Sequence, residues 1–232
     1  RGHGQSYAPP TGYSYRDHVN DLKWLIKELV MSRAFRQRSA AEARLLAFDP
    51  ENRLLGRGPR IRLDAEQIRD NALFVSGLIN LQMGGRGVNP YQPPNIWEPV
   101  GFVGSNTANY RQDSGPALYR RGIYVFFKRT APPPFMASFD APNREAFCTH
   151  RDRSNTPLQA LQLMNDIQHF EAARAFAQRL LTEGGATPVD RITYGYRLTL
   201  ARRPAPEEVA LVQSLLEKEL NRYRQNPEAA GK

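Results

Sequence analysis

The chain has 232 residues and a formal net charge of +9, and hydrophobic residues make up 41% of it. This length allows one large domain or two small ones, and this composition excludes wholesale disorder. No apolar run reaches the 18 residues of a membrane-spanning helix, so we expect no membrane span. The positive charge suits an anionic partner, but no run of five like charges occurs, so nucleic-acid binding is not expected.

Cysteine and histidine residues are too few and too scattered to build a metal centre. Cys148 is the only cysteine, which excludes an internal disulfide, a cysteine-based zinc site and covalent haem attachment by a CxxCH motif. The four histidines, His3, His18, His150 and His169, show no HExxH spacing. We therefore expect no metal, haem or other cofactor in this chain.

The first fifth of the chain predicts an arm followed by helices. Residues 1–14 are rich in Gly, Pro and Tyr and indicate a flexible arm or linker. From Tyr15 the apolar residues fall at helical spacing, and residues 32–36 end or bend this helix. A short helix is expected over residues 40–48. Asp49 followed by Pro50 predicts the start of another, because Asp is a good N-cap and Pro is favoured at the first helical position.

A further helix is predicted to begin after Asp64, which has a capping-box partner in Gln67. Its apolar pattern runs to Ile79, and Gly84 and Gly85 give a stop signal. Residues 84–117 lack periodicity and contain many prolines and glycines, which indicates a long loop of the kind that is often functional.

Residues 123–127 are β-branched and aromatic, which predicts a short strand; a buried helical turn is the alternative. The run Pro132-Pro133-Pro134 then excludes a helix interior or a central strand, and we expect it to be extended and rigid. A single helical turn is expected before Asp140.

The last third of the chain predicts consecutive helices. Thr156 followed by Pro157 is a strong helix start, Asp166 offers a second cap, and Gly184 ends the helix that follows. Two more helices are expected over residues 189–201 and after residue 206. The fold class is therefore mainly α, a multi-helix domain with long Pro/Gly-rich loops and at most a small β element. Residues 15–224 are expected to form this single domain, and residues 225–232 a tail.

The stretch from residue 118 to 166 carries the candidate site. Basic side chains flank its apolar run and follow its prolines, and guanidinium groups suit bidentate binding of carboxylate, sulfate or phosphate. Asp140, held by arginines, would stay ionised and act as the centre of an ion-pair cluster. The candidate residues for an anion site or a domain interface are Arg120, Arg121, Lys128, Arg129, Asp140, Arg144, Arg151 and Arg153.

Three roles for this stretch stay open at this point. The arginines can hold the loops by bonding to backbone carbonyls and carboxylates, bind an anionic ligand, or belong to an active site. No nucleophile–base pair is recognisable: Ser138, Ser154 and Cys148 lack an activating motif, and the position of His150 two residues from Cys148 does not define a dyad. Whether the chain is an enzyme is left open.

Several long segments resemble one known family. They cover residues 49–70 (DPENRLLGRGPRIRLDAEQIRD), residues 76–85 (SGLINLQMGG), residues 91–166 and residues 191–212 (RITYGYRLTLARRPAPEEVALV). Together they resemble the C-terminal domain of unknown function of planctomycete-type secreted proteins, which often also carry a planctomycete cytochrome-c-like domain. The resemblance implies a secreted or periplasmic location and a haem c bound to another domain. The family usually has a preceding helical region and continues past the end of this sequence, so we expect this chain to be a fragment or a processed product of a longer protein.

Two functions are compatible with these observations. The first is a non-catalytic docking module that binds other domains of the same full-length protein, including a haem c domain, or a partner in the cell envelope. The alternative is part of an extracellular enzyme or binding protein that acts on an anionic polymer such as sulfated polysaccharide.

Overall fold

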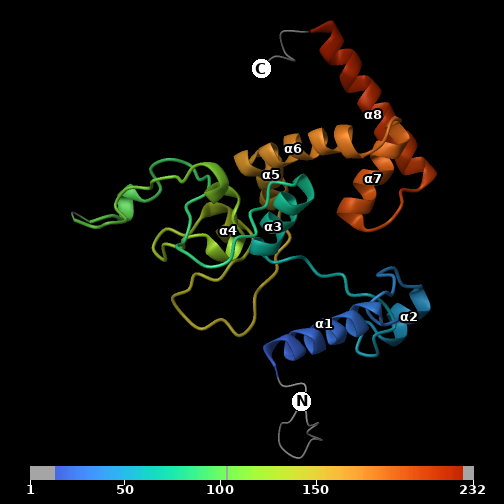
Figure 1. Cartoon of the computed structure of the whole chain (residues 1–232), viewed down its shortest axis with the longest axis horizontal. Helices are drawn as coiled ribbons and strands as arrows, with labels where there is room; N and C mark the ends of the chain where they lie inside the picture. Colours follow the sequence, from blue (N-terminus) through green and yellow to red (C-terminus); the bar gives the residue numbers. More distant parts are fainter. Residues whose placement is uncertain (1–13, 103, 227–232) are drawn as a thin grey trace, which may run out of the picture. The chain divides into compact units, whose positions relative to one another are not determined.

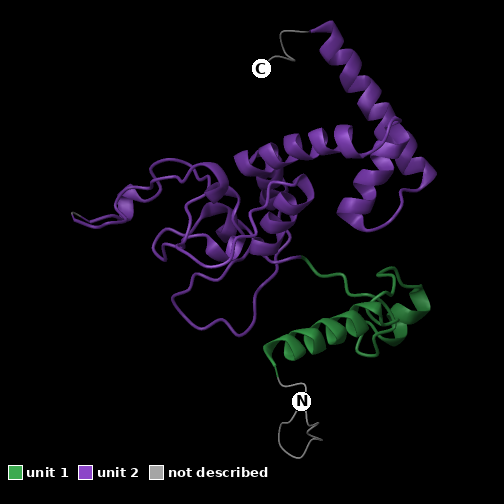
Figure 2. Cartoon of the chain, viewed as in Figure 1, with its two compact units in different colours: residues 1–62 green, residues 63–232 purple. Residues whose placement is uncertain are grey.

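The structure is a computed structural model that describes residues 14–102 and 104–226. The chain divides into two compact units, residues 1–62 and residues 63–232 (Figures 1 and 2). Helices make up 52% of the structure and strands 2%, which confirms the mainly α fold class. Most of the expected arm and of the expected tail lies outside the described residues. Within the described ranges, no helix is long and apolar enough to cross a membrane.

Unit 1 contains helices α1 (Tyr15–Met31) and α2 (Ala43–Phe48). A capping box begins α1: the Ser14 hydroxyl accepts from the backbone N of Asp17 (3.2 Å), and the Asp17 carboxylate accepts from the backbone N of Ser14 (3.1 Å). The prediction for α1 is confirmed. Helix α2 begins three residues after the predicted start at residue 40.

The helix predicted to begin at Asp49 is wrong, because this residue closes a turn. Its carboxylate accepts hydrogen bonds from the backbone N of Arg53 (2.9 Å) and of Leu54 (2.8 Å). These donors lie four and five residues ahead, beyond the reach of an N-cap. Asn52 and Leu55 have φ values of 55° and 52°, which a right-handed helix does not allow.

Unit 2 begins with α3 (Ala65–Ser76), and its predicted capping box is confirmed: Asp64 donates its backbone N to Oε1 of Gln67 (3.1 Å). The predicted stop at residues 84–85 is wrong. Gly77 ends the helix in the left-handed conformation, at φ 81°. The backbone N of residue 78 then bonds to the carbonyl oxygen of Leu73 (2.9 Å), which closes the last turn.

The long loop after α3 contains three short 3-10 helices, η1 (Glu98–Val100), η2 (Gly115–Tyr119) and η3 (Gly122–Tyr124). The strand predicted over residues 123–127 is wrong, and the helical turn that was its alternative is present. Gly122 lies so close to α3 that an added Cβ would come within 3.0 Å of Glu66. Residues 122–124 form the helical turn. Of the predicted strand, only Val125 forms a bridge, which is an isolated parallel pair with Val88.

The remaining helices agree with prediction and are α4 (Pro134–Ser138), α5 (Pro157–Asn165), α6 (Ile167–Glu183), α7 (Pro188–Leu200) and α8 (Pro206–Gln225). The Thr156 capping box is formed, because Oγ1 of Thr156 accepts from the backbone N of Gln159 (3.4 Å) and the Gln159 side chain accepts from the backbone N of Thr156 (3.1 Å). Gly184 caps α6 at its C-terminus, as predicted.

The core of unit 2 lies where α3 packs against α4, η3 and α6. Ala65 and Leu73 on α3 are fully buried, and Val125, Met136 and Phe139 are at most 4% exposed. The core is therefore built from a helix face and from the loop and proline segments that surround it. By contrast, α1 and α8 contain no buried residue.

Candidate functional site

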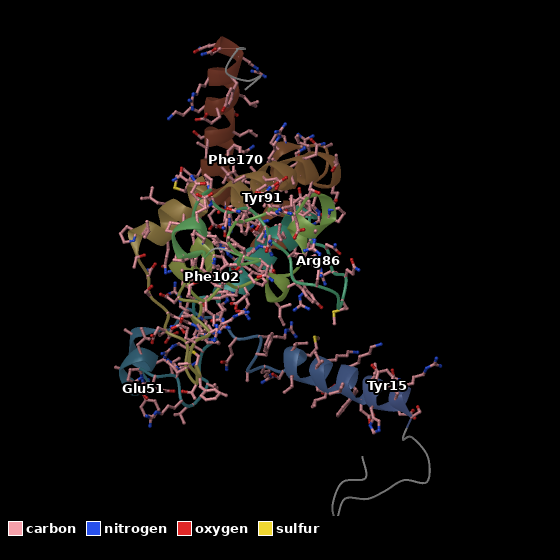
Figure 3. The ribbon with its side chains drawn as sticks, turned by 90° about the vertical axis from the view of Figure 1, so that its left-hand side faces the viewer. Tyr15, Glu51, Arg86, Tyr91, Phe102 and Phe170 are labelled. Atoms are coloured by element: carbon pink, nitrogen blue, oxygen red, sulfur yellow. The ribbon has the colours of Figure 1, made fainter. Side chains whose placement is uncertain are left out.

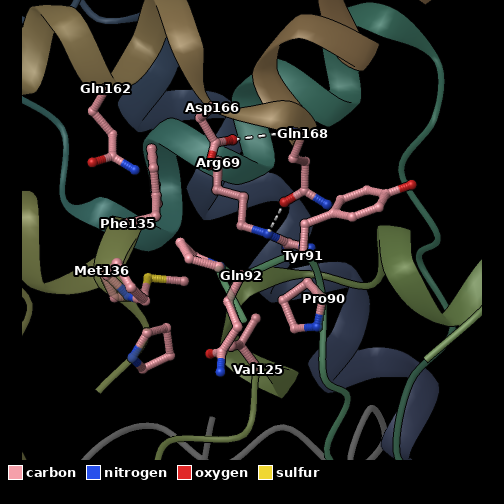
Figure 4. A pocket seen from close by; sticks show the side chains of 13 residues that line it. Arg69, Pro90, Tyr91, Gln92, Val125, Phe135, Met136, Gln162, Asp166 and Gln168 are labelled. Carbon is pink, nitrogen blue, oxygen red and sulfur yellow. Dashed lines mark hydrogen bonds between the residues drawn. The ribbon is translucent and has the colours of Figure 1, made fainter. Parts of the chain in front are cut away.

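A buried arginine lies at the centre of unit 2. Arg69 on α3 is 3% exposed and donates hydrogen bonds from all three of its side-chain nitrogens. Nε bonds to Oε1 of Gln168 on α6 (2.6 Å), Nη1 to the carbonyl oxygen of Arg120 (2.6 Å) and Nη2 to that of Leu118 (2.8 Å). Figure 4 shows Arg69 reaching Gln168 from below α6. We name Arg69 and these partners the Arg69 hub; it joins α3, α6 and the segment of η2 and η3.

The Arg69 hub carries a positive charge in a dry environment. Burial lowers the pKa of Arg69 to about 10, although the carboxylates of Asp70 and Asp166 counteract this effect. The nearer of the two carboxylates belongs to Asp70, whose Oδ1 lies 3.6 Å from Nη1. With a pKa of about 10 the guanidinium stays ionised at neutral pH, so its charge is available to hold carbonyl oxygens in place.

Asp166 joins α5 to α6 beside this hub. Its Oδ1 caps α6 by accepting from the backbone N of Gln168 and of His169 (both 3.1 Å), and it lies 3.0 Å from Nδ1 of His169. Burial acts to raise the pKa of Asp166, but the hydrogen bonds from His169 outweigh it, so this pKa lies below its ordinary value. The His169 ring stacks on Phe135 of α4 at a centroid distance of 4.8 Å.

A cavity of about 30 Å³ lies between these elements. Figure 4 shows its walls, which come from α3, α4, α5, α6, the proline segment and the long loop. Its volume is more than the roughly 10–15 Å³ that one buried water needs, whereas pockets for small organic ligands measure about 300–1,000 Å³. The bonds of Arg69 therefore join the elements around a small cavity.

Arg120, the first of the predicted site residues, is a second buried arginine that holds a loop. It is 6% exposed and donates to the carbonyl oxygens of Arg86 (2.9 Å), Gln82 (3.1 Å) and Gly84. Its guanidinium also lies 3.8 Å from the ring centroid of Tyr124. These contacts wrap residues 82–86 around one side chain, so Arg120 fixes the start of the long loop.

Arg121 and Lys128 lie at other points of the same region. Nε of Arg121, a side chain that is 44% exposed, lies 3.8 Å from Oδ2 of Asp70. Nζ of Lys128 donates to the carbonyl oxygen of Thr107 (2.7 Å) and lies 5.1 Å from the ring centroid of Trp97. Arg121 thus contacts helix α3, Lys128 contacts the long loop, and Arg129 is exposed.

Three predicted arginines gather beside the N-terminus of α3. Nη1 of Arg151 lies 2.7 Å from Oε2 of Glu66, and Nη2 of Arg153 lies 3.4 Å from Oδ1 of Asp64. Arg144 also acts electrostatically on Glu66 and lies 4.5 Å above the ring of Phe127. Burial acts to raise the pKa of Glu66, but the hydrogen bond from Arg151 outweighs it and the pKa is lowered.

Asp140 lies at the start of α5 in a polar network. Its carboxylate accepts from the backbone N of Ser154 (2.7 Å), from the Ser154 hydroxyl (2.8 and 2.9 Å) and from Nε2 of Gln159 (3.5 Å). Gln159 is 1% exposed and also donates to the carbonyl oxygen of Ser138 (2.8 Å). These bonds tie the loop to the helix that Thr156 caps. A direct ion pair between Asp140 and the arginines stays a prediction.

The sequence analysis missed the Arg69 hub and its partner Gln168. A signal was present: Ala65, Arg69, Leu73 and Ser76 share the spacing of one helix face, and all four are buried. An arginine placed four residues from an alanine and four from a leucine on such a face indicates a buried guanidinium. Within the described ranges, no group of three or more His, Cys, Asp or Glu residues is arranged to hold a metal ion.

These contacts define a helical domain whose long loops are fixed by buried arginines bonded to backbone carbonyls. Residues 13–216 match the family described as PSD1, a protein of unknown function (DUF1553), and the chain belongs to this family. No curated protein matches the chain, and no solved structure does.

Proposed function

We propose that the chain is a non-catalytic docking module of a secreted protein in the cell envelope. Its partners are other domains of the same full-length protein, including a haem c domain. The secreted location and the haem c partner rest on the resemblance to planctomycete-type secreted proteins. The docking role rests on the surface of unit 2.

One observation carries this proposal. Large apolar side chains recur every third residue along α5 and the start of α6, and each of them is between 55% and 75% exposed. We name these five residues of the two helices the α5–α6 stripe; they are Leu158, Leu161, Met164, Ile167 and Phe170. Phe170 can be located on α6 in Figure 3. Soluble proteins rarely expose large apolar patches, and such patches mark interaction sites.

The composition of the stripe also favours a protein partner. Helix α5 contains no charged residue. The fully buried centre of a protein interface is likewise depleted of charge and enriched in Phe and Met. Covering one large apolar side chain is worth about 1.5–3 kcal/mol, so five of them supply a substantial driving force for docking.

The chemistry of the central stretch supports a non-catalytic role. The cavity at the Arg69 hub is small, at about 30 Å³, and the Cys148 thiol lies 3.1 Å from the backbone carbonyl oxygen of His150. Arg120, Lys128 and Arg151 are engaged by partners within the chain. Their contacts favour loop bracing over binding of a sulfated polysaccharide.

The test compares hydroxyl-radical labelling of Met164 and Phe170 in the longer natural protein and in this 232-residue chain. We expect labelling of both residues to fall at least threefold in the longer protein, because another domain covers the stripe. Phe147, which is fully exposed on the loop before α5, serves as the internal reference. Equal labelling of the stripe in both proteins would contradict the proposal.

A charged substitution in the stripe tests whether the stripe itself is the docking surface. Met164→Glu places a charge in the stripe and is expected to restore the labelling of Phe170 in the longer protein. The matched control is Met83→Glu, because Met83 is also 75% exposed but lies on the long loop. If Met83→Glu restores labelling equally well, the stripe has no special role in docking.

A further inference from the structure

The segment that follows α3 pairs along one of its two edges. The backbone N of Asn80 donates to the carbonyl oxygen of Tyr119 (2.9 Å), and Asn80 forms an isolated parallel bridge with Arg120. The carbonyl oxygens of Gln82 and Gly84 accept from the Arg120 guanidinium. Residues 80, 82 and 84 therefore all turn main-chain groups toward the same neighbouring segment.

The opposite edge of this segment is open. In an extended chain, the main-chain groups of successive residues point to alternate edges, so those of Leu81 and Met83 point away from Arg120. Among the residues that the structure describes, none bonds to the N–H or C=O of Leu81 or of Met83. The side chains of these two residues are 59% and 75% exposed. Four main-chain groups are thus free to pair with another extended chain.

The sequence of this edge lacks the usual protection against pairing. Proteins protect an open edge with charged side chains, proline or a bulge, because the edge otherwise recruits another chain. Residues 77–85 (GLINLQMGG) contain neither a charged residue nor a proline. Gly84 and Gly85 have φ values of 74° and 84°, so they change the chain direction only at the end of the segment. Residues 78–83 form an unprotected edge about 20 Å long.

We infer that residues 78–83 bind an extended, uncharged peptide segment of a partner by strand addition. The N–H and C=O groups of Leu81 and Met83 exchange hydrogen bonds with the main chain of this segment. Ile79 and Leu81 also line a groove of about 590 Å³ beside Tyr119, so the partner carries apolar side chains at alternate positions on that face. This inference goes beyond the proposed function, since it concerns a different surface of unit 2.

The free main-chain groups favour this occupant over others. The main-chain groups of a helix bond within the helix, and a lipid surface offers no partner for N–H and C=O groups in its hydrocarbon. No basic residue lies within residues 77–85, so an anionic polymer finds no charge there. A second copy in two-fold pairing about Gln82 would use only Leu81 and Met83 of each chain, and it would bring together two chains of net charge +9.

The test uses three synthetic peptides as probes. The first has about eight residues of alternating Val and Thr, which favour an extended chain. The second has the same sequence with its main-chain nitrogens methylated, so it lacks N–H donors. The third is an amphipathic helix of Leu and Gln. We expect the natural chain to bind the first peptide about tenfold more tightly than either of the others, which corresponds to about 1.4 kcal/mol. Equal binding of the first and second peptides, or tighter binding of the helix, overturns the inference.

Two substitutions of one residue separate the main-chain edge from its side chains. Leu81→Pro removes the outward N–H, and proline favours the extended conformation that Asn80 before it requires. The matched control Leu81→Ala keeps the N–H and removes the apolar side chain. We expect Leu81→Pro to bind the first peptide about tenfold more weakly and Leu81→Ala to stay within about threefold of the natural chain. Circular dichroism checks that both variants keep their helices. Unchanged binding by Leu81→Pro, or equal losses in both variants, contradicts strand addition.

Hydrogen exchange of the natural chain locates the bound peptide without any substitution. The amides of Leu81 and Met83 are expected to exchange about tenfold more slowly when the first peptide is bound, because they then donate hydrogen bonds. The amide of Asn80, which already donates to Tyr119, should change little. Unchanged exchange at Leu81 and Met83 shows that the peptide binds elsewhere and overturns the inference.

Sedimentation decides between a peptide partner and a second copy. The natural chain is expected to be a monomer at the peptide-binding concentrations. A dimer that Leu81→Pro dissociates and Leu81→Ala keeps would overturn the inference in favour of self-pairing. All these measurements use the 232-residue chain, whereas the α5–α6 stripe is tested by labelling in the longer protein, so the two proposals fail separately.

Discussion

Helices α1 and α3 begin with the same local signals and end in opposite environments. Both open with a capping box, and both carry apolar residues at helical spacing. Five residues of α3 are buried, whereas none of α1 is. The difference arises from what surrounds each helix: α3 is enclosed by α4, α6 and the long loop of its own unit, while no described residue of α1 is buried. Capping and periodicity specify a helix, but only its neighbours specify a core.

The largest effect is expected from breaking the Arg69 hub. Arg69→Ala leaves the buried carbonyl oxygen of Arg120 and Oε1 of Gln168 without this donor, and the Leu118 carbonyl oxygen keeps only the bond from Nε2 of Gln168 (3.2 Å). It also removes the cation that faces Asp70. Breaking a buried charged contact of this kind costs about 3–5 kcal/mol. The control Arg121→Ala removes an exposed arginine and should cost less than about 1 kcal/mol. Urea unfolding measures both, and equal losses would show that the hub does not stabilise unit 2.

The comparison of the two helices is tested directly by a pair of leucines. Leu73 on α3 is 0% exposed, so Leu73→Ala should lower the free energy of unfolding by about 2–5 kcal/mol. Leu22 on α1 is 58% exposed, so Leu22→Ala should change it by less than about 0.5 kcal/mol. A large loss from Leu22→Ala would mean that α1 is covered in solution.

A smaller effect is expected at the start of α5. Thr156→Ala removes the hydroxyl that accepts from the backbone N of Gln159, and loss of such a cap costs about 1 kcal/mol. Thr156→Ser keeps the hydroxyl and serves as the matched control. Equal midpoints of thermal unfolding for the two variants would argue against a capping role.

The smallest effect is expected in the dependence of stability on pH. The folded chain holds the pKa of Asp166 below its ordinary value of 3.8, so this group stabilises the fold above that pH. The contribution is lost as the pH falls through the lowered folded pKa. In Asp166→Asn, the free energy of unfolding should therefore fall less steeply below about pH 4 than in the natural chain. Above about pH 5 its dependence on pH should be the same in both proteins. Parallel curves for both proteins below pH 4 would contradict this assignment.

Much of the helical framework was predictable from the sequence, because caps and apolar spacing act over three or four residues. Thr156, Asp166 and Gly184 were placed correctly for this reason. The predicted helix at Asp49 is absent because the Asp49 carboxylate closes a turn. The predicted helix end at residues 84–85 was too late because Gly77 adopts the left-handed conformation and ends α3 there. The strand at residues 123–127 failed because a close approach of Gly122 to α3 decided the backbone there.

The candidate site was less predictable, since its contacts span large distances in sequence. The sequence analysis singled out the basic residues between 120 and 153, and the structure bonds several of them to carbonyls and carboxylates. Which arginine is buried depends on partners such as Leu118 and Gln168, and no local pattern reveals them. Only the helical spacing of Arg69 between Ala65 and Leu73 carried this information.

The large separation of Arg69 and Gln168 in the sequence also matters while the chain is being synthesised. The two residues are 99 positions apart, so α3 leaves the ribosome long before its partner on α6 exists. At a synthesis rate of about 5–20 residues per second, that interval is about 5–20 s. Until then Arg69 lacks its bond to Gln168 and α3 lacks the cover of α6, although η3 and α4 are synthesised earlier. The nascent chain is therefore most vulnerable to aggregation and proteolysis in this interval, and a chaperone that binds α3 would act there.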